Sequence, residues 1–101
     1  MDIQKTIDDI VKTHKVVLFM KGTPKFPQCG FSSKAVQLLQ QSGCKDFFPV
    51  NVLENDEIRQ GIKLYADWPT IPQLYINGEF MGGADIMMEM YEAGELQQAL
   101  A

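Results

Sequence analysis

The chain has 101 residues, of which 46% are hydrophobic and 22% are charged, and its formal net charge is −4. This balance is typical of one ordinary globular domain with a modest core, so we expect a single domain over residues 1–101. A net negative chain without a basic run is not expected to have nucleic acid as its main partner. No stretch reaches the roughly 20 apolar residues that a membrane span needs.

The cysteine count and the N-terminal sequence bear on the compartment. Two cysteines are present, and no basic segment followed by an apolar one opens the chain. Thiols stay free or act transiently in reducing compartments, and a cleaved secretion signal is not expected. We therefore expect a cytoplasmic protein, or a protein of an organelle matrix if a transit segment has been removed.

The N-terminal residues predict a helix. Asp2 is a candidate N-cap, and the apolar positions that follow recur at helical spacing, at Ile3, Ile7, Ile10 and Val11. His14 comes just after this helix, near two lysines. A catalytic or metal-binding role for this single histidine is one interpretation, and a solvated residue at a helix C-terminus is the one that we favour.

A strand, a helix and a second strand follow. Residues 16–20 form a short apolar run that suits a buried strand, and from Cys29 the apolar spacing becomes helical. This helix is predicted to end at Gly43, in the left-handed conformation. Residues 47–52 predict the second strand, in which Pro49 indicates an edge position. The strand–helix–strand order predicts that the two strands run parallel.

The second half of the chain predicts a helix and then a hairpin. Residues 54–66 have apolar side chains at helical spacing. Asn77-Gly78 lies between two β-rich runs, residues 72–76 and 79–82. Asn-Gly in this position is the strongest short hairpin signal, and it predicts a type I′ turn.

The C-terminal residues predict two more helical segments. Asp85 opens the first, which has three methionines within residues 87–90. Methionines can serve as soft metal ligands, but core packing on a helix is the interpretation that we favour. Gly94 ends this helix, and residues 95–100 form a final short turn or helix.

The order of elements, α-β-α-β-α-β-β-α, predicts an α/β fold. A parallel βαβ half is joined through a helix to an antiparallel ββα half. A four-stranded mixed sheet with helices on both faces accounts for this order, and the arrangement resembles the thioredoxin-like fold.

Cys29 is the strongest candidate for chemistry. It follows a loop with one glycine and two prolines and lies at the start of a helix. A thiol there faces unpaired backbone N–H groups and the positive end of the helix dipole. Lys21 and Lys25 add positive charge, so the pKa of Cys29 is expected to lie below the free value of roughly 8.5. A buried structural thiol is the alternative, and the proline-rich loop argues against it.

The second cysteine is not expected to pair with the first. Cys44 lies at the other end of the same helix, roughly 20 Å from Cys29 at about 1.5 Å per residue. A disulfide needs Cα atoms within about 7 Å. The residue at the second thiol position of a C-x-x-C motif is Ser32. The chain is therefore predicted to act as a monothiol, with Cys44 as a packing residue or a surface thiol.

A monothiol that attacks a disulfide needs an outside thiol to release it, so glutathione is an expected partner. Candidate groups for its two carboxylates are Lys21, Arg59 and the backbone donors of Gly83, Ala84 and Asp85. Solvated positions are the alternative for Arg59 and for Lys63, which shares an adjoining helix face. If the Ile71–Pro72 bond is cis, an exposed backbone edge is available at Thr70, Ile71 and Pro72.

These residues lie in sequence blocks that resemble the monothiol glutaredoxins of the CGFS type. Cys29-Gly30-Phe31-Ser32 is the signature of that family. Three further blocks match in the expected order: Lys21-Gly-Thr-Pro24, Trp68-Pro-Thr-Ile-Pro72 and Gly82-Gly-Ala-Asp85. The resemblance covers nearly the whole chain and implies a glutaredoxin fold.

The resemblance also implies a binding site. Pro72 would be cis, and Trp68 would shape the same wall. Some members have a cysteine where this chain has Ala84, so a disulfide to that position is not available here. The residues implied to hold glutathione are Lys21, Cys29, Gly30, Phe31, Arg59, Thr70, Ile71, Pro72, Gly83, Ala84 and Asp85.

What the family implies is iron–sulfur cluster handling more than disulfide reduction. A 2Fe–2S cluster needs four thiolates, and this chain offers one at the site, that of Cys29. Two chains and two glutathione molecules supply four, which predicts a homodimer bridged by the cluster. The resemblance further implies BolA-type partner proteins and apo iron–sulfur recipient proteins.

Two other functions stay open. One is a glutathione-dependent thiol–disulfide oxidoreductase that removes glutathione from proteins through Cys29, an activity that the family analogy implies to be weak. The other is a thioredoxin-like adaptor without thiol chemistry. The adaptor predicts that Cys29→Ser leaves all binding and cellular function intact.

Overall fold

A mixed four-stranded β-sheet lies at the centre of the structure, a computed structural model that describes residues 2–101. The strands lie in the order β2-β1-β3-β4. β1 runs parallel to β2 and antiparallel to β3, and β3 runs antiparallel to β4. This confirms the predicted mixed sheet and the edge position of the strand that contains Pro49. The strands are β1 (Val16–Met20), β2 (Phe48–Asn51), β3 (Gln73–Ile76) and β4 (Glu79–Gly82).

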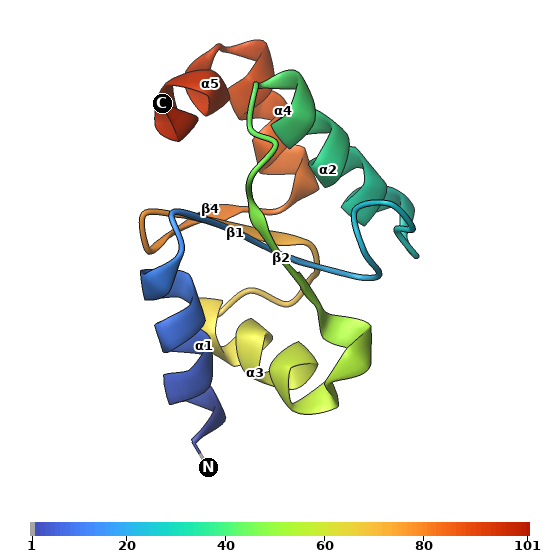
Figure 1. The fold of residues 1–101 in the computed structure, drawn as a ribbon, viewed down its shortest axis with the longest axis vertical. Helices are drawn as coiled ribbons and strands as arrows, with labels where there is room; N and C mark the ends of the chain where they lie inside the picture. Colours follow the sequence, from blue (N-terminus) through green and yellow to red (C-terminus); the bar gives the residue numbers. More distant parts are fainter. Residues whose placement is uncertain (1) are drawn as a thin grey trace.

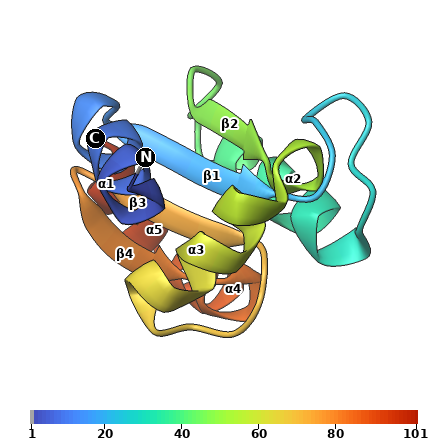
Figure 2. The same cartoon turned by 90° about the horizontal axis from the view of Figure 1, so that it is seen from below.

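Helices cover both faces of this sheet (Figure 1). One face carries α2 (Gly30–Gln41), α4 (Ala84–Glu92) and α5 (Glu95–Leu100). The other carries α1 (Ile3–Thr13) and α3 (Asp56–Ala66), which lie in front of the strands in the view from below (Figure 2). The fold is thus the α/β thioredoxin-like arrangement that the order of elements predicted. Among residues 2–101, no helix has the length and apolar character that crossing a bilayer requires.

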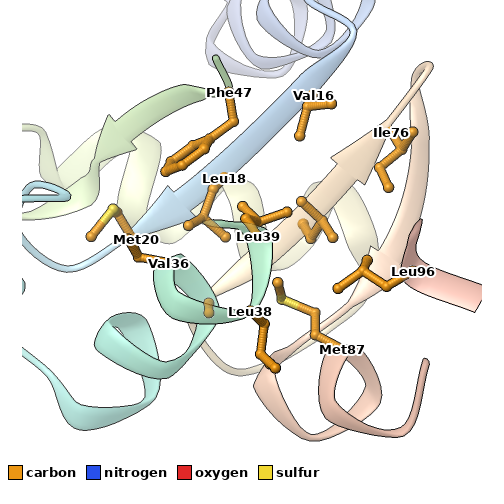
Figure 3. Packing of buried hydrophobic residues seen from close by; sticks show 12 residues of the cluster. Val16, Leu18, Met20, Val36, Leu38, Leu39, Phe47, Ile76, Met87 and Leu96 are labelled. Atoms are coloured by element: carbon orange, nitrogen blue, oxygen red, sulfur yellow. The ribbon is translucent and has the colours of Figure 1, made fainter. Parts of the chain in front are cut away.

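β1 contributes to two cores because successive side chains of a strand point to opposite faces of the sheet. The core on one face combines side chains of α2, α4 and α5 with Val16, Leu18 and Met20 (Figure 3). The core on the other face combines the apolar stripes of α1 and α3 with Val17 and Phe19. All five residues of β1 are buried. The strand that leads into the Cys29 loop is therefore fixed from both sides.

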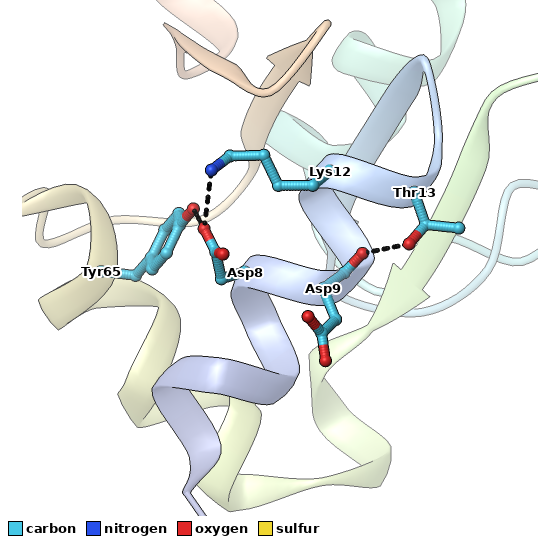
Figure 4. A network of polar contacts seen from close by, with 5 residues as sticks. All are labelled: Asp8, Asp9, Lys12, Thr13 and Tyr65. Carbon is cyan, nitrogen blue, oxygen red and sulfur yellow. Dashed lines mark hydrogen bonds and ion pairs between the residues drawn. The ribbon is translucent and has the colours of Figure 1, made fainter.

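A polar contact also joins α1 to α3 (Figure 4). The Tyr65 hydroxyl donates a hydrogen bond to Asp8 Oδ1 over 2.6 Å, and Lys12 Nζ lies 3.2 Å from the same oxygen. The hydrogen bonds from Tyr65 and Lys12 lower the pKa of Asp8. Burial raises the pKa of Tyr65 to about 12, and the hydrogen bond to Asp8 and the charge of Asp8 add to this effect. Tyr65 thus keeps its proton at neutral pH and connects the two helices.

Side-chain caps set where the helices on this face begin. Asp2 caps α1 as predicted, because its Oδ1 accepts a hydrogen bond from the Gln4 N–H over 3.0 Å. The helix expected over residues 54–66 begins two residues later, at Asp56, because Asn55 caps it. The preceding residues form a short 3-10 helix, η1 (Val52–Glu54). Helical spacing alone could not locate this change of helix type.

The turns have the predicted backbone conformations. Asn77 and Gly78 have φ of 53° and 81°, which a type I′ hairpin turn requires. Gly43 has φ of 89°, as expected for a glycine that follows a helix C-terminus. The Ile71–Pro72 peptide bond is cis, which confirms that prediction.

Candidate functional site

Cys29 is the N-cap residue of α2 and is half-buried. The pKa of Cys29 is lowered mainly by the backbone N–H of Ser32, with further contributions from the Phe31 N–H, the charge of Lys21 and the Ser32 hydroxyl, and partial burial opposes them. The direction of this shift agrees with the prediction, as does its main cause, the backbone N–H groups of the first helical turn. Lys25, also expected to contribute, is exposed and is not among the groups that lower this pKa.

The loop before Cys29 closes on itself. The Gln28 N–H donates to the Lys21 carbonyl oxygen over 2.8 Å, and the Phe26 N–H donates to the Thr23 carbonyl oxygen over 3.0 Å. Gly22 has φ of 93°, and a Cβ there would lie 2.5 Å from the Phe26 carbonyl oxygen. This position therefore requires glycine. The closed loop brings Lys21 back beside the thiol.

Two polar side chains hold the base of this loop. Ser32 is fully buried, and its Oγ accepts a hydrogen bond from the Lys21 N–H over 3.0 Å. Asn51, at the end of β2, accepts hydrogen bonds through Oδ1 from the Gly22 N–H over 2.9 Å and from the Leu53 N–H over 3.0 Å. In the sequence, Ser32 indicates only the absence of a second thiol, and Asn51 is not among the predicted site residues. A polar residue that ends a strand beside a loop was the available signal for Asn51.

A cavity of about 460 Å³ opens beside Cys29. It brings together nine of the eleven predicted site residues, and Trp68 forms part of the same wall as expected. The cavity is lined by Lys21, Cys29, Phe31, Lys63, Trp68, Pro69, Thr70, Ile71, Pro72, Gly83, Ala84, Asp85 and Ile86.

The predicted residues Arg59 and Gly30 do not line this cavity. Arg59 is half-buried on α3, and Lys63, one turn further along the same helix, lines the cavity instead. The sequence predicts a shared helix face for both and a solvated position as the alternative for both, with Arg59 alone as a candidate site residue. The position of Lys63 closer to the Trp68 block was the signal that could have identified it. Gly30 borders a second hollow of about 430 Å³ on another side of Cys29.

The start of α4 and the cis-proline loop also form part of the cavity wall. Gly83 is the N-cap of α4, and a Cβ there would lie 3.2 Å from the Pro72 carbonyl oxygen. A side chain would therefore press the two segments apart. The close approach leaves the first-turn N–H groups of α4 at the cavity, an arrangement that favours anions.

The charges of the cavity are available for a ligand. In the part of the chain that the structure describes, the one ion pair joins Lys12 to Asp8, so Lys21 and Lys63 are not paired with protein carboxylates. The indole Nε1 of Trp68 and the Nε of Arg59 are buried without a hydrogen-bond partner in the same part of the chain. The cavity thus combines the Cys29 sulfur with the cations of Lys21 and Lys63 and with the N-terminus of α4.

Cys44 lies beyond the other end of α2 and packs half-buried against the core of that face. Burial, with the charge of Asp46 adding to it, raises the pKa of this thiol. Cys44 borders a separate cavity of about 390 Å³ that does not include Cys29. The prediction that Cys44 is a packing residue rather than the partner of Cys29 is consistent with these two free thiols.

The other candidate ligands have structural positions. The His14 ring stacks on Phe48, with centroids 3.8 Å apart and planes 5° from parallel. Met87 is buried in the core, and Met88 and Met90 pack against it, as predicted. Over residues 2–101, no group of three or more His, Cys, Asp or Glu side chains is placed to hold a metal ion.

Comparison with known proteins relates this geometry to a family. The glutaredoxin family model matches residues 16–81. A monothiol glutaredoxin of Synechocystis, described as uncharacterized, is 57% identical over 94 residues, which are 93% of this chain and 87% of that protein. The mitochondrial glutaredoxin-related protein 5 of Danio rerio is 50% identical over 97 residues. These are 96% of this chain, which spans only 63% of the length of the zebrafish protein.

A solved structure gives the same result in three dimensions. The solution structure of reduced apo GrxS14 from poplar matches with a TM-score of 0.81 and 57% sequence identity. The match covers 95% of this chain and 87% of the poplar chain. Since the family model spans more than half of the sequence and the monothiol relatives share at least half of the aligned residues, the chain belongs to the glutaredoxin family and is one of its monothiol members.

Proposed function

We propose that this chain binds glutathione in the cavity beside Cys29, and that two chains with two glutathione molecules assemble a 2Fe–2S cluster and transfer it to other proteins. The observation that carries the proposal is a single thiol with a lowered pKa at a cavity whose lysines are not paired with protein carboxylates. A lone thiolate can attack a disulfide or ligate iron, but it cannot complete either task without a second thiol.

Glutathione fits the cavity by charge. It has two carboxylates, one ammonium group and one thiol. Lys21 and Lys63 lie on the cavity wall and offer cations to one carboxylate, and the N-terminus of α4 offers backbone N–H groups to the other. The exposed Asp85 carboxylate offers a partner for the ammonium group. Arg59, half-buried one turn before Lys63, would act at the outer edge of this site.

The number of ligands supports a cluster shared between two chains. A 2Fe–2S cluster needs four ligands, which are usually thiolates. The described residues provide one thiol at the cavity, because Cys44 lies at the other end of α2. Two Cys29 sulfurs and two glutathione sulfurs complete the set. The homodimer, BolA-type partners that replace one half of it, and apo iron–sulfur recipients are the partners that this proposal includes.

Chemical reconstitution tests the cluster. Protein, iron, sulfide and glutathione are combined without oxygen, and the product is analysed by size-exclusion chromatography and by iron and sulfide content. We expect a coloured dimer with about one cluster per two chains, and we expect no cluster when glutathione is left out. Cys44→Ser is the matched control and should form the same dimer, whereas Cys29→Ser should form none. A colourless monomer from wild type, or a cluster in Cys29→Ser, would reject the proposal.

A second function is supported by the lowered pKa of Cys29. In this reaction the Cys29 thiolate attacks the glutathionyl sulfur of a glutathionylated protein, and the protein thiolate leaves. A second glutathione thiolate then attacks the Cys29–glutathione disulfide, which releases oxidised glutathione and restores Cys29. Turnover of a glutathionylated protein at about 1–1000 s⁻¹ would favour this enzyme over the cluster carrier.

The compartment follows from the same chemistry. Both cysteines are free thiols, and free thiols persist where glutathione keeps them reduced. We propose the cytoplasm, or an organelle matrix, as the location. Detection of the tagged protein in cell fractions tests this location, and its recovery in the fraction of an oxidising compartment would contradict it.

A further inference from the structure

Gln73 connects the sheet to one wall of the cavity. It is the first residue of β3, directly follows the cis-proline and is fully buried. Its Nε2 donates hydrogen bonds to the carbonyl oxygens of Trp68 and Thr70, each over 3.2 Å. Trp68 and Thr70 both line the cavity. A single buried amide therefore fixes two points of this wall.

Tyr75 fixes the orientation of that amide. Its hydroxyl donates a hydrogen bond to Gln73 Oε1 over 3.1 Å. Tyr75 is 2% exposed, and burial raises the pKa of its hydroxyl, which stays protonated and continues to donate. Because Oε1 is engaged as an acceptor, the two N–H donors of the amide are directed to the loop carbonyls. An amide flip would disrupt all three hydrogen bonds.

Ring contacts support the same wall from behind. The Tyr75 ring lies 5.4 Å from the Phe80 ring, and the Phe80 ring lies 5.5 Å from the Trp68 ring, between centroids. These separations are typical of interacting aromatic pairs. Tyr75 thus supports Trp68 both through Gln73 and through Phe80.

The sheet itself does not hold this segment. β3 pairs with β1 and β4 only from Gln73 onward. Residues 68–72, which line the cavity, therefore lie outside the strand pairing that rigidifies the rest of β3. The side chain of Gln73 links this segment to the paired strands by hydrogen bonds, in addition to the contact between the Phe80 and Trp68 rings.

We propose that Gln73, oriented by Tyr75, is the positioning residue that sets the shape of the 68–72 wall and so sets the affinity for glutathione. This inference rests on the proposed glutathione binding. The loop that carries Lys21 is held by two other side chains, Ser32 and Asn51. Loss of Gln73 should therefore weaken glutathione binding without changing the pKa of Cys29, a separation that a general loosening of the fold would not produce.

Calorimetric titration with reduced glutathione tests the inference in wild type, Gln73→Leu, Tyr75→Phe and the double variant. We expect Gln73→Leu to raise the Kd about tenfold and Tyr75→Phe about threefold, because hydrogen bonds that fix the wall are lost. The double variant should bind no more weakly than Gln73→Leu, because Tyr75 acts through Gln73. Ultraviolet thiolate absorbance should give the same Cys29 pKa in all four proteins.

Tyr65→Phe is the matched control. It removes a tyrosine hydroxyl from the same face of the sheet, but that hydroxyl bonds to Asp8 and not to the cavity wall. It should lower the melting temperature and leave the Kd unchanged. If Gln73→Leu does not fold, Tyr75→Phe carries the test alone, because it keeps the buried ring.

The outcomes separate this inference from the function on which it rests. Glutathione binding by wild type, with a Kd changed less than about twofold in Gln73→Leu and Tyr75→Phe, would overturn the inference alone. A parallel shift of the Cys29 pKa in these variants would also overturn it. No binding by wild type would contradict the proposed function, and the inference with it.

Discussion

The two cysteines lie at opposite ends of α2, and their thiols have opposite tendencies. Cys29 lies at the N-cap, where the N–H groups of Ser32 and Phe31 lower its pKa. Cys44 follows the C-terminal end, where burial is the main cause of its raised pKa. Both side chains are half-buried and both are free. The difference therefore lies in the backbone N–H groups that Cys29 faces and in burial, which is the main cause of the raised pKa of Cys44.

The two ends of a helix present different backbone groups. The N-terminus presents unpaired N–H donors and partial positive charge, and the C-terminus presents carbonyl oxygens and partial negative charge. A thiolate is stabilised by the first set and not by the second. The N-terminus of α2 thus lowers the pKa of Cys29, whereas burial is the main cause of the raised pKa of Cys44. Four experiments test this difference between the two thiols.

The largest effect is expected for modification by oxidised glutathione. The Cys29 thiolate attacks the disulfide, one glutathione thiolate leaves, and one glutathionyl group stays on the protein. Mass spectrometry should find a single adduct on wild type and on Cys44→Ser, and none on Cys29→Ser at matched times. An adduct that forms first on Cys44 would reverse the comparison between the two thiols.

Ser32→Ala removes a buried acceptor on the Cys29 side of the comparison. The Lys21 N–H loses its partner, so we expect a loss of about 1–3 kcal/mol in the free energy of unfolding. The pKa of Cys29 should rise because the Ser32 hydroxyl is among the groups that lower it. Urea unfolding and thiolate absorbance measure the two effects. Ser33→Ala is the neighbouring control, and an equal loss in both variants would remove the specific role of Ser32.

Lys21→Met tests the smaller electrostatic contribution to the same thiolate. The pKa of Cys29 should rise, because the charge of Lys21 lowers it. Glutathione affinity should fall about two- to fivefold, as expected for one partly exposed ion pair. Both effects should shrink at high ionic strength. Lys25→Met is the matched control and should change neither quantity; a larger effect of Lys25 would contradict the geometry of the loop.

The smallest effect is expected in the pH dependence of stability. The lowered pKa of Cys29 means that the folded state loses this proton first, so its contribution to stability falls as pH decreases from the unfolded pKa through the folded one. The raised pKa of Cys44 has the opposite consequence, and its contribution is lost as pH rises through the folded pKa.

Urea unfolding measures how the free energy of unfolding changes with pH. Wild type and each cysteine-to-serine variant are compared between neutral pH and pH above roughly 8.5. On raising the pH, wild type should gain stability relative to Cys29→Ser and lose stability relative to Cys44→Ser. If wild type gained stability relative to both variants, or lost it relative to both, the pKa values of the two thiols would not be shifted in opposite directions.

Most of the fold could be predicted because local signals and tertiary structure agree. The Asn77-Gly78 turn, the left-handed Gly43 and the buried run of β1 each require a particular backbone conformation, and each occurs as predicted. The start of α3 could not be predicted from periodicity, because the caps of Asn51 and Asn55 divide the segment into two helix types.

The site could be predicted where the chemistry is local. The lowered pKa of Cys29 follows from its place in the chain, and the cis bond before Pro72 follows from the matched sequence block. The roles of Lys63, Asn51 and Gln73 depend on contacts between segments that are distant in sequence or on the direction of a side chain. Helical or strand spacing does not contain this information.

Ultraviolet titration of the thiolate in Cys44→Ser and in Cys29→Ser, each of which retains one cysteine, tests the central claim most directly. We expect Cys29 to titrate below the free thiol value of roughly 8.5 and Cys44 to titrate above it. Two thiols that titrate together, or Cys44 titrating first, would contradict the assignment of Cys29 as the reactive sulfur.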